Sequence, residues 1–457
     1  MDFKTIFVLF GGLALFIYGM QQMGEGLQKT AGDKMRHFLA LLTGTPLRGV
    51  LVGALVTMMI QSSSATTVMV IGFTSAGLMS LEQAIGVIMG ANIGTTITAW
   101  IVAANIDEFA WLFVAIGFVM MFIIKKPKIR YIGQIVFAFG ALFVGLNAMT
   151  AAIKPLATSQ AFADLLIGIK DKPVLGLMLG MGTTMVTQSS SASIGVLQAM
   201  AGTSIDAAGT PLVSLYQTIP ILLGSNIGTT ITAILASIGA SKAAKRAAAS
   251  HAIFNIAGSV LFMLCLRPYT WLINYLISLT GRSLVLDVHA GLSSVWTPLA
   301  PYMKESVALS HTVFNIVNTM IWLPLVWLMA KIVRFIVPGE DPEVCRKRVY
   351  IDYNVVGNPT IAIDLATQEL ARMTEIAMEM TQDSHRIIKE HDSQLENKIF
   401  ANEETLDYLE NEIVRYLSHI ISASSLTHEN SSRIAALMHA ANDIERIGDY
   451  CSNVSDN

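Results

Sequence analysis

Charged residues are scarce in this chain. Asp, Glu, Lys and Arg make up 14% of its 457 residues, whereas 53% are hydrophobic. That balance excludes an ordinary soluble domain, in which about 25% of residues are charged. Most of the acidic residues lie beyond Gly339. The composition therefore predicts a protein of the lipid bilayer with a polar C-terminal part, and it indicates no nucleic-acid partner.

Cysteine is almost absent as well. The three cysteines, Cys265, Cys345 and Cys451, show no paired or Cys-x-x-Cys spacing, so we expect free thiols and no metal site built on them. The chain also lacks a nucleophile–base pair, a glycine loop followed by lysine, and a metal triad. We therefore predict that the protein is not an enzyme and uses no organic cofactor.

Long apolar stretches dominate the first three quarters of the chain, and several approach the ~20 residues that span a bilayer as a helix. The first, near Thr5–Met23, has one lysine in front of it and no convincing small-residue cleavage site. A matching segment recurs later, so we interpret the first as a retained helix rather than a secretory signal. The stretches predict a multi-pass protein of the cytoplasmic (inner) membrane.

Two polar strings interrupt these apolar stretches, and each occurs twice. Gln-Ser-Ser-Ser-Ala stands at Gln61–Ala65 and Gln188–Ala192, with an offset of 127 residues. A second string surrounds Asn-Ile-Gly-Thr-Thr at Gly90–Ala99 and Gly224–Ala233, with an offset of 134. Hydroxyls and amides are costly in hydrocarbon unless they bind something. The duplication therefore predicts two repeats that share a polar site.

We expect each Gln-Ser-Ser-Ser string to form the tip of a re-entrant hairpin. Gly49–Met79 has 31 residues, whereas two crossings and a turn need ~40. The second hairpin is expected at about Val174–Met200. The helices that follow, Gln83–Ala104 and roughly Leu215–Ile238, are expected to be interrupted at their glycine–asparagine strings, which would free backbone groups for a ligand.

Counting the crossings predicts how the repeats are oriented. The first half has three expected crossings, near Thr5–Met23, Gln83–Ala104 and Phe109–Ile124, so the second half enters from the opposite face. The excess of lysine and arginine on one side then places the N-terminus outside and the C-terminal domain in the cytoplasm. The predicted fold is an all-α polytopic membrane protein of two inverted repeats, with re-entrant hairpins, interrupted helices and a soluble helical-bundle tail.

Shifts in composition set the predicted domain boundaries. Residues 1–131 form repeat 1, and residues 132–337 form repeat 2 with the helices that follow it. Residues 338–353 are a linker. Residues 354–457 form a cytosolic helical domain that ends where a helix is expected to continue.

The polar strings suit an anion and a cation together. A half-helix that begins at a hairpin tip offers unpaired N–H groups and the positive end of its dipole, and neighbouring serines add donors. Neutral Asn, Thr and carbonyl oxygens suit a hard cation such as sodium. Because no charged residue is expected inside the core of either repeat, bound cations would compensate the anion. Close helix packing is the alternative role of such small residues.

Ser250–Asn255 and Ser310–Asn315 share a Ser-His-x-x-Phe-Asn pattern. Their histidines either line a path or form a hydrogen-bonded helix contact. With the duplicated strings, they make Thr5–Val337 closely resemble the type II sodium/phosphate cotransporters. From about Asn354 the tail resembles a PhoU-type helical bundle, judged from Glu403–Asp407 and Asp443–Tyr450.

The resemblance implies sodium-coupled symport of inorganic phosphate by alternating access, with sodium as the coupling ion. It implies phosphate binding by Ser62, Ser63, Ser64, Ser190, Ser191, Asn92, Thr95 and Asn226. It implies sodium binding by Gln61, Gln188, Ser189, Thr229 and Thr232. PhoU-type proteins bind metals through carboxylates, so the resemblance implies that Glu445 and Asp449 are metal ligands. The two residues are four apart on one helical face. Exposed acidic pairs of this kind are more often simply solvated.

Two departures limit the resemblance. The first half has no His-x-x-Phe-Asn segment after Asn92–Thr95. Ala252 and Thr312 follow the histidines where electrogenic animal members carry Asp. The number of sodium ions and the net charge moved therefore stay open.

Two other functions fit the same residues. One is sodium-coupled transport of another oxyanion or a dicarboxylate, because hydroxyl-rich tips do not distinguish these from phosphate. The other is a membrane phosphate sensor that acts through its tail on a cytosolic regulatory partner.

Overall fold

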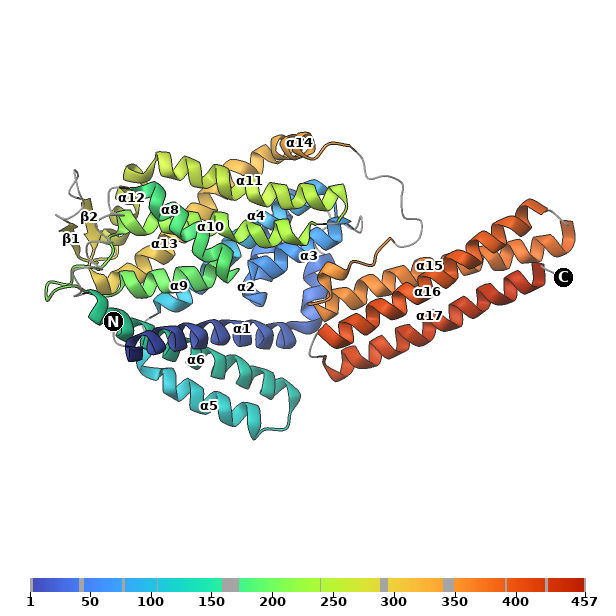
Figure 1. Cartoon of the computed structure of the whole chain (residues 1–457), viewed down its shortest axis with the longest axis horizontal. Coiled ribbons are helices and arrows are strands. Elements are labelled where there is room, and N and C mark those ends of the chain that lie inside the picture. Colours follow the sequence, from blue (N-terminus) through green and yellow to red (C-terminus); the bar gives the residue numbers. More distant parts are fainter. Residues whose placement is uncertain are drawn as a thin grey trace. The chain divides into compact units, whose positions relative to one another are not determined.

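The computed structural model describes residues 3–40, 45–75, 79–104, 106–157, 172–238, 240–287, 295–339, 349–390, 393–423 and 426–455. Almost all of them are helical, and one antiparallel pair of short strands joins β1 (Leu284–Asp287) to β2 (Val295–Pro298) (Figure 1). The chain forms two compact units. Unit 1 is Met1–Thr67, Leu81–Ile238 and Lys245–Val337; unit 2 is Val68–Ser80, Gly239–Ala244 and Pro338–Asn457.

Among the residues that the structure describes, six helical segments are long and apolar enough to cross a membrane. This confirms the prediction of an all-α polytopic membrane protein. The six are Phe3–Leu27, Leu81–Ala103, Pro127–Ile153, Leu215–Ala236, Lys242–Leu264 and Ala300–Ile336.

Each Gln-Ser-Ser-Ser string separates two short helices, as predicted. They are α2 (Pro46–Ile60) and α3 (Ser63–Ser75), then α8 (Pro173–Thr187) and α9 (Ser190–Ala201). The breaks coincide with the chain's two non-glycine residues of positive φ among those described, Gln61 at 58° and Gln188 at 52°. At ~1.5 Å per residue these helices are ~18–23 Å long, short of the ~30 Å hydrocarbon core.

The helices after the hairpins are not interrupted, so that prediction was wrong. Both α4 (Leu81–Ala103) and α10 (Leu215–Ala236) run continuously through their glycine–asparagine strings. The glycines serve close packing instead. A Cβ added to Gly94 would lie 2.5 Å from the Ala54 carbonyl oxygen on α2, and one on Gly228 would lie 2.6 Å from the Met181 oxygen on α8. Small residues let helix backbones approach in this way.

The two hairpins repeat the same internal contact. Thr57 Oγ1 donates to Thr66 Oγ1 over 2.9 Å, and Thr184 Oγ1 donates to Ser193 Oγ over 2.9 Å. Each hydrogen bond ties the first arm of a hairpin to the second. The sequence duplication is therefore also a structural one.

The predicted third crossing of the first half, Phe109–Ile124, is a helix of only 13 residues, α5 (Ala110–Phe122). It packs on α6 (Pro127–Ala157), which in turn packs on α1 (Phe3–Ala40) (Figure 1). A 13-residue helix reaches ~20 Å, less than the hydrocarbon core. The count of crossings therefore stays open, and inversion of the repeats stays a prediction.

The rest of unit 1 follows α10. Helices α11 (Lys242–Leu264) and α13 (Ala300–Trp322) pack through Phe262 and Phe314, whose rings are edge-to-face with centroids 5.0 Å apart. In the chain, α12 (Leu266–Leu279) and the β1–β2 pair lie between these two helices. A 3-10 turn, Leu323–Leu325, separates α13 from α14 (Val326–Ile336).

Unit 2 contains the predicted helical tail, built from α15 (Pro359–Glu390), α16 (Ser393–Ala423) and α17 (His428–Ser455). Most of the predicted linker, with Cys345, lies outside the described residues. The segment before α15 is fixed to the bundle, since fully buried Glu369 accepts hydrogen bonds from three successive backbone amides, at Val349, Tyr350 and Ile351. Tyr416 Oη on α16 also donates to the Asp352 carbonyl oxygen over 3.0 Å.

Unit 2 also holds the second half of α3. Gly72 faces the segment before α15, because a Cβ added there would lie 2.5 Å from Val355 Cγ1 and 3.2 Å from Asp352 Oδ2. Val355 is buried. The helix that begins with the first serine string thus ends in the same compact unit as the tail.

Candidate functional site

The first hairpin tip is held by hydrogen bonds to its own repeat. Gln61 donates through Nε2 to the Met58 carbonyl oxygen over 2.6 Å and accepts through Oε1 from Thr98 Oγ1 over 3.0 Å. Ser62 precedes α3, and its Oγ accepts from the Ala65 amide over 3.1 Å, as an N-cap residue does. The backbone N–H groups of Ser63 and Ser64, the first in α3, have no carbonyl acceptor within the helix.

The second tip has the same local form with fewer side-chain contacts. Ser189 caps α9, and its Oγ accepts from the Ala192 amide over 3.2 Å. Ser190 is 5% exposed, whereas Gln188 is exposed and its side chain makes no hydrogen bond to the described part of the chain. Two helix N-termini with their serines therefore exist in one unit, each with the positive dipole end that attracts anions.

One contact joins the motifs of the two repeats. Thr232 Oγ1 on α10 donates to Ser64 Oγ at the first tip over 3.2 Å. Ser64 had been assigned to phosphate and Thr232 to sodium. The fold thus brings together a serine of the first repeat and a threonine of the second, although they are 168 residues apart in the chain.

Of the remaining predicted residues, Ser191 lies half-buried in the first turn of α9, and the other four lie buried on α4 and α10. Asn92 is 6% exposed, Thr95 7%, Asn226 4% and Thr229 4%. Both threonine hydroxyls donate a hydrogen bond to a carbonyl oxygen of their own helix, Thr95 to Ala91 and Thr229 to Ser225. Their oxygen lone pairs stay available, which suits a cation more than an anion.

Thr98 was not among the predicted site residues, and the sequence leaves the role of His311 open. Thr98 is the repeat partner of Thr232 at the offset of 134 residues, which is a signal that could have identified it. His311 on α13 lies with Nε2 3.0 Å from Asn226 Oδ1 and is 1% exposed. His251, in the matching string on α11, is fully buried, and neither ring nitrogen has a hydrogen-bond partner in the described part of the chain.

Within the described residues, no aspartate, glutamate, lysine or arginine side chain takes part in the side-chain hydrogen bonds that these tips and strings make. The site combines hydroxyls, amides and two helix N-termini. Such neutral groups bind an anion through donors and a hard cation through oxygens, without a fixed countercharge.

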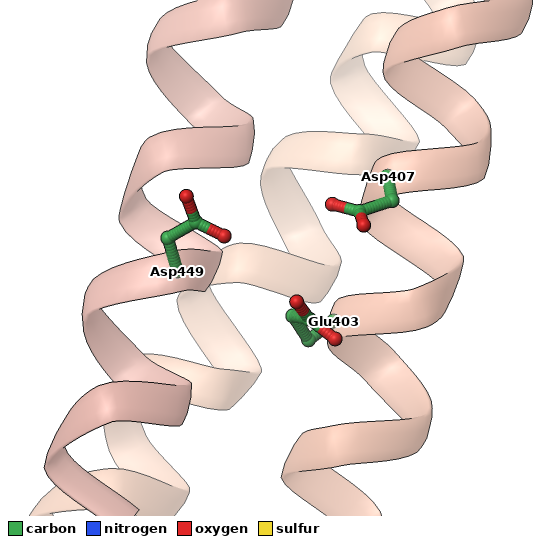
Figure 2. A group of neighbouring side chains, drawn as sticks. All are labelled: Glu403, Asp407 and Asp449. Carbon is green, nitrogen blue, oxygen red and sulfur yellow. The ribbon is translucent and has the colours of Figure 1, made fainter.

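The tail contains a separate cluster of carboxylates. Glu403 and Asp407 on α16 and Asp449 on α17 each offer an oxygen within 4.8 Å of the others, and all three point into the space between the two helices (Figure 2). Of the predicted pair, Asp449 belongs to this group. Glu445 lies one turn earlier on α17, where burial first and the charge of Asp449 next raise the pKa of its carboxyl.

Burial and the neighbouring carboxylates Asp407 and Asp449 also raise the pKa of Glu403. Carboxylate oxygens grouped in this way are the ligands of Mg²⁺, Ca²⁺ and Mn²⁺. The residues present therefore fit the kind of metal that the PhoU-type resemblance implied.

Comparison with protein families gives two matches. A family described as Na+/Pi-cotransporter matches residues 15–151 and 147–280, and the PhoU domain matches residues 370–457. No solved structure matches the chain significantly.

Several relatives are similar to this chain. "Uncharacterized protein YqeW" of Bacillus subtilis is 30% identical over 336 residues, which are 73% of this chain and 99% of the relative. "Putative inorganic phosphate export protein YjbB" of Escherichia coli K12 is 22% identical over 97% of this chain and 76% of the relative. "Sodium-dependent phosphate transport protein 2B" of Homo sapiens is 37% identical over 100 residues, 21% of this chain and 14% of the relative.

Proposed function

Because this chain belongs to the Na+/Pi-cotransporter family, we propose that it carries inorganic phosphate across the cytoplasmic membrane together with sodium ions. The observation that carries the proposal is the hydrogen bond from Thr232 to Ser64, which joins the polar motifs of the two repeats. A solute held at that contact touches both repeats at once. It would be released to either side when one repeat moves against the other.

The proposed phosphate ligands are the first amides of α3 and α9 with their serines, Ser62, Ser63, Ser64, Ser190 and Ser191, and the side chains of Asn92, Thr95 and Asn226. The proposed sodium ligands are the oxygens of Gln61, Gln188, Ser189, Thr229 and Thr232. A sodium ion beside the anion supplies the positive charge that these neutral side chains do not.

The direction of transport follows from the sodium gradient in this proposal. Sodium that binds with phosphate and enters down its gradient would bring phosphate inward, with the tail in the cytoplasm and the repeats inverted. The relative YjbB is named for phosphate export. Phosphate movement is therefore measured in vesicles with sodium placed either in the outer medium or in the interior. The side from which sodium drives phosphate separates uptake from export.

Uptake of labelled phosphate into proteoliposomes tests the function. An inward sodium gradient should give accumulation, and an equal potassium gradient should give none. A matched pair of variants adds specificity. Gln188→Ala should weaken the dependence on sodium, whereas Gln198→Ala on α9, which bonds only the backbone oxygens of Ala99 and Lys304, should keep it. Sulfate or succinate outcompeting phosphate would assign another oxyanion or a dicarboxylate instead.

We further propose that the tail regulates the first hairpin. The supporting observation is the contact of Gly72 with Val355 inside unit 2. Val355 belongs to the segment that Glu369 and Tyr416 fix to the bundle, and Gly72 belongs to the helix whose first turn carries Ser63 and Ser64. A change in the bundle can therefore reach the first tip along one helix.

A further inference from the structure

Asn92 and Asn226 are repeat partners at the offset of 134 residues. Their side-chain amides nevertheless form hydrogen bonds through different atoms, the nitrogen in Asn92 and the oxygen in Asn226. Asn92 Nδ2 donates to the Ile88 carbonyl oxygen over 2.8 Å on its own helix. Asn226 instead presents Oδ1 to His311 Nε2 at 3.0 Å. The two halves of the site therefore differ in polarity although their sequences match.

The difference decides what each amide can offer to a ligand. An amide carries its acceptor lone pairs on oxygen and its donor hydrogens on nitrogen. At Asn92 the nitrogen is engaged, and Oδ1 makes no hydrogen bond to the described residues. At Asn226 the oxygen is engaged, and Nδ2 is buried without a hydrogen-bond partner in the part of the chain that the structure describes. A buried donor left unpaired is unfavourable, so a ligand oxygen there would be stabilising.

His311 is the cause of this difference. The Asn226 oxygen can only accept, so the hydrogen bond requires the proton of the imidazole on Nε2. His311 comes from α13, outside the duplicated strings, and the first repeat has no His-x-x-Phe-Asn segment after Asn92. The second repeat therefore has an orienting group that the first one lacks.

We propose that Asn226, oriented by His311, donates to phosphate, while Asn92 gives its oxygen to a sodium ion. His311 is a positioning residue in this arrangement, and Asn92 moves from the phosphate set to the sodium set. The inference rests on the proposed function, and it adds which ligand each of the paired asparagines contacts.

The test measures two constants in proteoliposomes: the KM for phosphate at saturating sodium, and the half-saturating sodium concentration at saturating phosphate. Asn226→Ala should raise the phosphate KM about tenfold and change the sodium constant less than about twofold. Asn92→Ala should do the reverse. Asn318→Ala, which removes a buried hydrogen bond from α13 to the Phe254 oxygen, controls for general packing loss and should leave the ratio of the two constants unchanged.

The positioning role of His311 is tested by comparing the phosphate KM of single and double variants. His311→Ala should raise the phosphate KM, and the His311→Ala, Asn226→Ala double variant should be no worse than Asn226→Ala alone. His311→Gln keeps a donor and should recover part of the phosphate affinity. If the alanine variants do not fold, Asn226→Leu and Asn92→Leu replace them, because leucine keeps the approximate size and shape of the side chain and offers neither the amide donor nor the amide acceptor.

The outcomes separate this inference from the proposed function. If the wild type shows no sodium-dependent phosphate uptake, both are overturned. If the wild type transports but both asparagine variants shift the same constant, or His311→Ala adds in full to Asn226→Ala, only the inference on polarity is overturned.

Discussion

Thr232 Oγ1 on α10 lies within hydrogen-bond distance of Ser64 Oγ at the first hairpin tip, 3.2 Å away. The same hydroxyl lies 2.9 Å from the Thr229 carbonyl oxygen, one turn earlier on α10. A single side chain thus links the second repeat to the tip of the first. This is the type of contact that a site shared between repeats requires.

Removing that hydroxyl should weaken transport without unfolding the protein. Thr232→Val keeps the shape of the side chain and is expected to lower phosphate uptake about tenfold, since one contact between the repeats and one sodium ligand are lost. Thr230→Val is the matched control, because the Thr230 hydroxyl bonds only the Ile227 oxygen on its own helix. Uptake by Thr232→Val equal to that of Thr230→Val would contradict the assignment of Thr232.

The glycines of α4 test the packing explanation of the second string. Gly94→Ala should lower the midpoint of thermal unfolding in detergent, because its Cβ would meet the Ala54 oxygen at 2.5 Å. Overpacking of this kind costs about 1–3 kcal/mol. Gly182→Ala on α8 meets nothing within 4 Å, so it should leave the midpoint unchanged or raise it. Equal effects of the two substitutions would contradict the packing role of Gly94.

The same glycines show where sequence reasoning reached its limit. The breaks at Gln61 and Gln188 could be predicted because the apolar runs are too short for two crossings and their polar strings are duplicated. The continuity of α4 could not. Glycine beside asparagine is a common signal for both unwinding and close packing, and the choice depends on whether another backbone, here that of α2, approaches.

The site, like the fold, could be predicted only in part from the sequence. Residues inside the duplicated strings could be assigned, and Thr98 could have been added from its offset to Thr232. The contact of His311 with Asn226 could not be inferred, since it joins residues 85 apart on different helices and only one of the two repeats has it. Local patterns identify candidate ligands, whereas the atom that each one presents is set by its neighbours in space.

The acidic cluster of the tail should make its stability depend on pH. The raised pKa values of Glu403 and Glu445 mean that the folded tail holds these protons more tightly than the unfolded chain. The stability they contribute is full below their usual pKa of 4.5 and is lost as the pH rises through the raised values. The protection factors of α16 and α17 in the full chain, which correct the exchange rates for the intrinsic pH dependence of amide exchange, should therefore be larger at pH 4.5 than at pH 7.

A divalent cation should reverse that loss if the cluster binds metal. Millimolar Mg²⁺, Ca²⁺ or Mn²⁺ at pH 7 should slow exchange in α16 and α17, and Asp407→Asn should abolish the effect. Glu404→Gln, on the same helix but outside the three-carboxylate group, should keep it. Identical exchange with the cation and with a chelator would leave these residues as solvated acids.

The link between tail and hairpin predicts a change in transport from a residue remote from the serines. Gly72→Val should displace Val355 and alter the phosphate uptake rate severalfold, because the added side chain occupies the space of Val355 Cγ1. Gly357→Val is the control within the same unit, since no atom lies within 4 Å of its added Cβ. Wild-type rates in both variants would contradict regulation by this route.

Direct binding of phosphate to the purified protein is the measurement that decides whether the two solutes share one site. Joint binding predicts that sodium lowers the dissociation constant of phosphate, and that phosphate lowers that of sodium by the same factor. A phosphate dissociation constant that is the same in sodium and in potassium would contradict it.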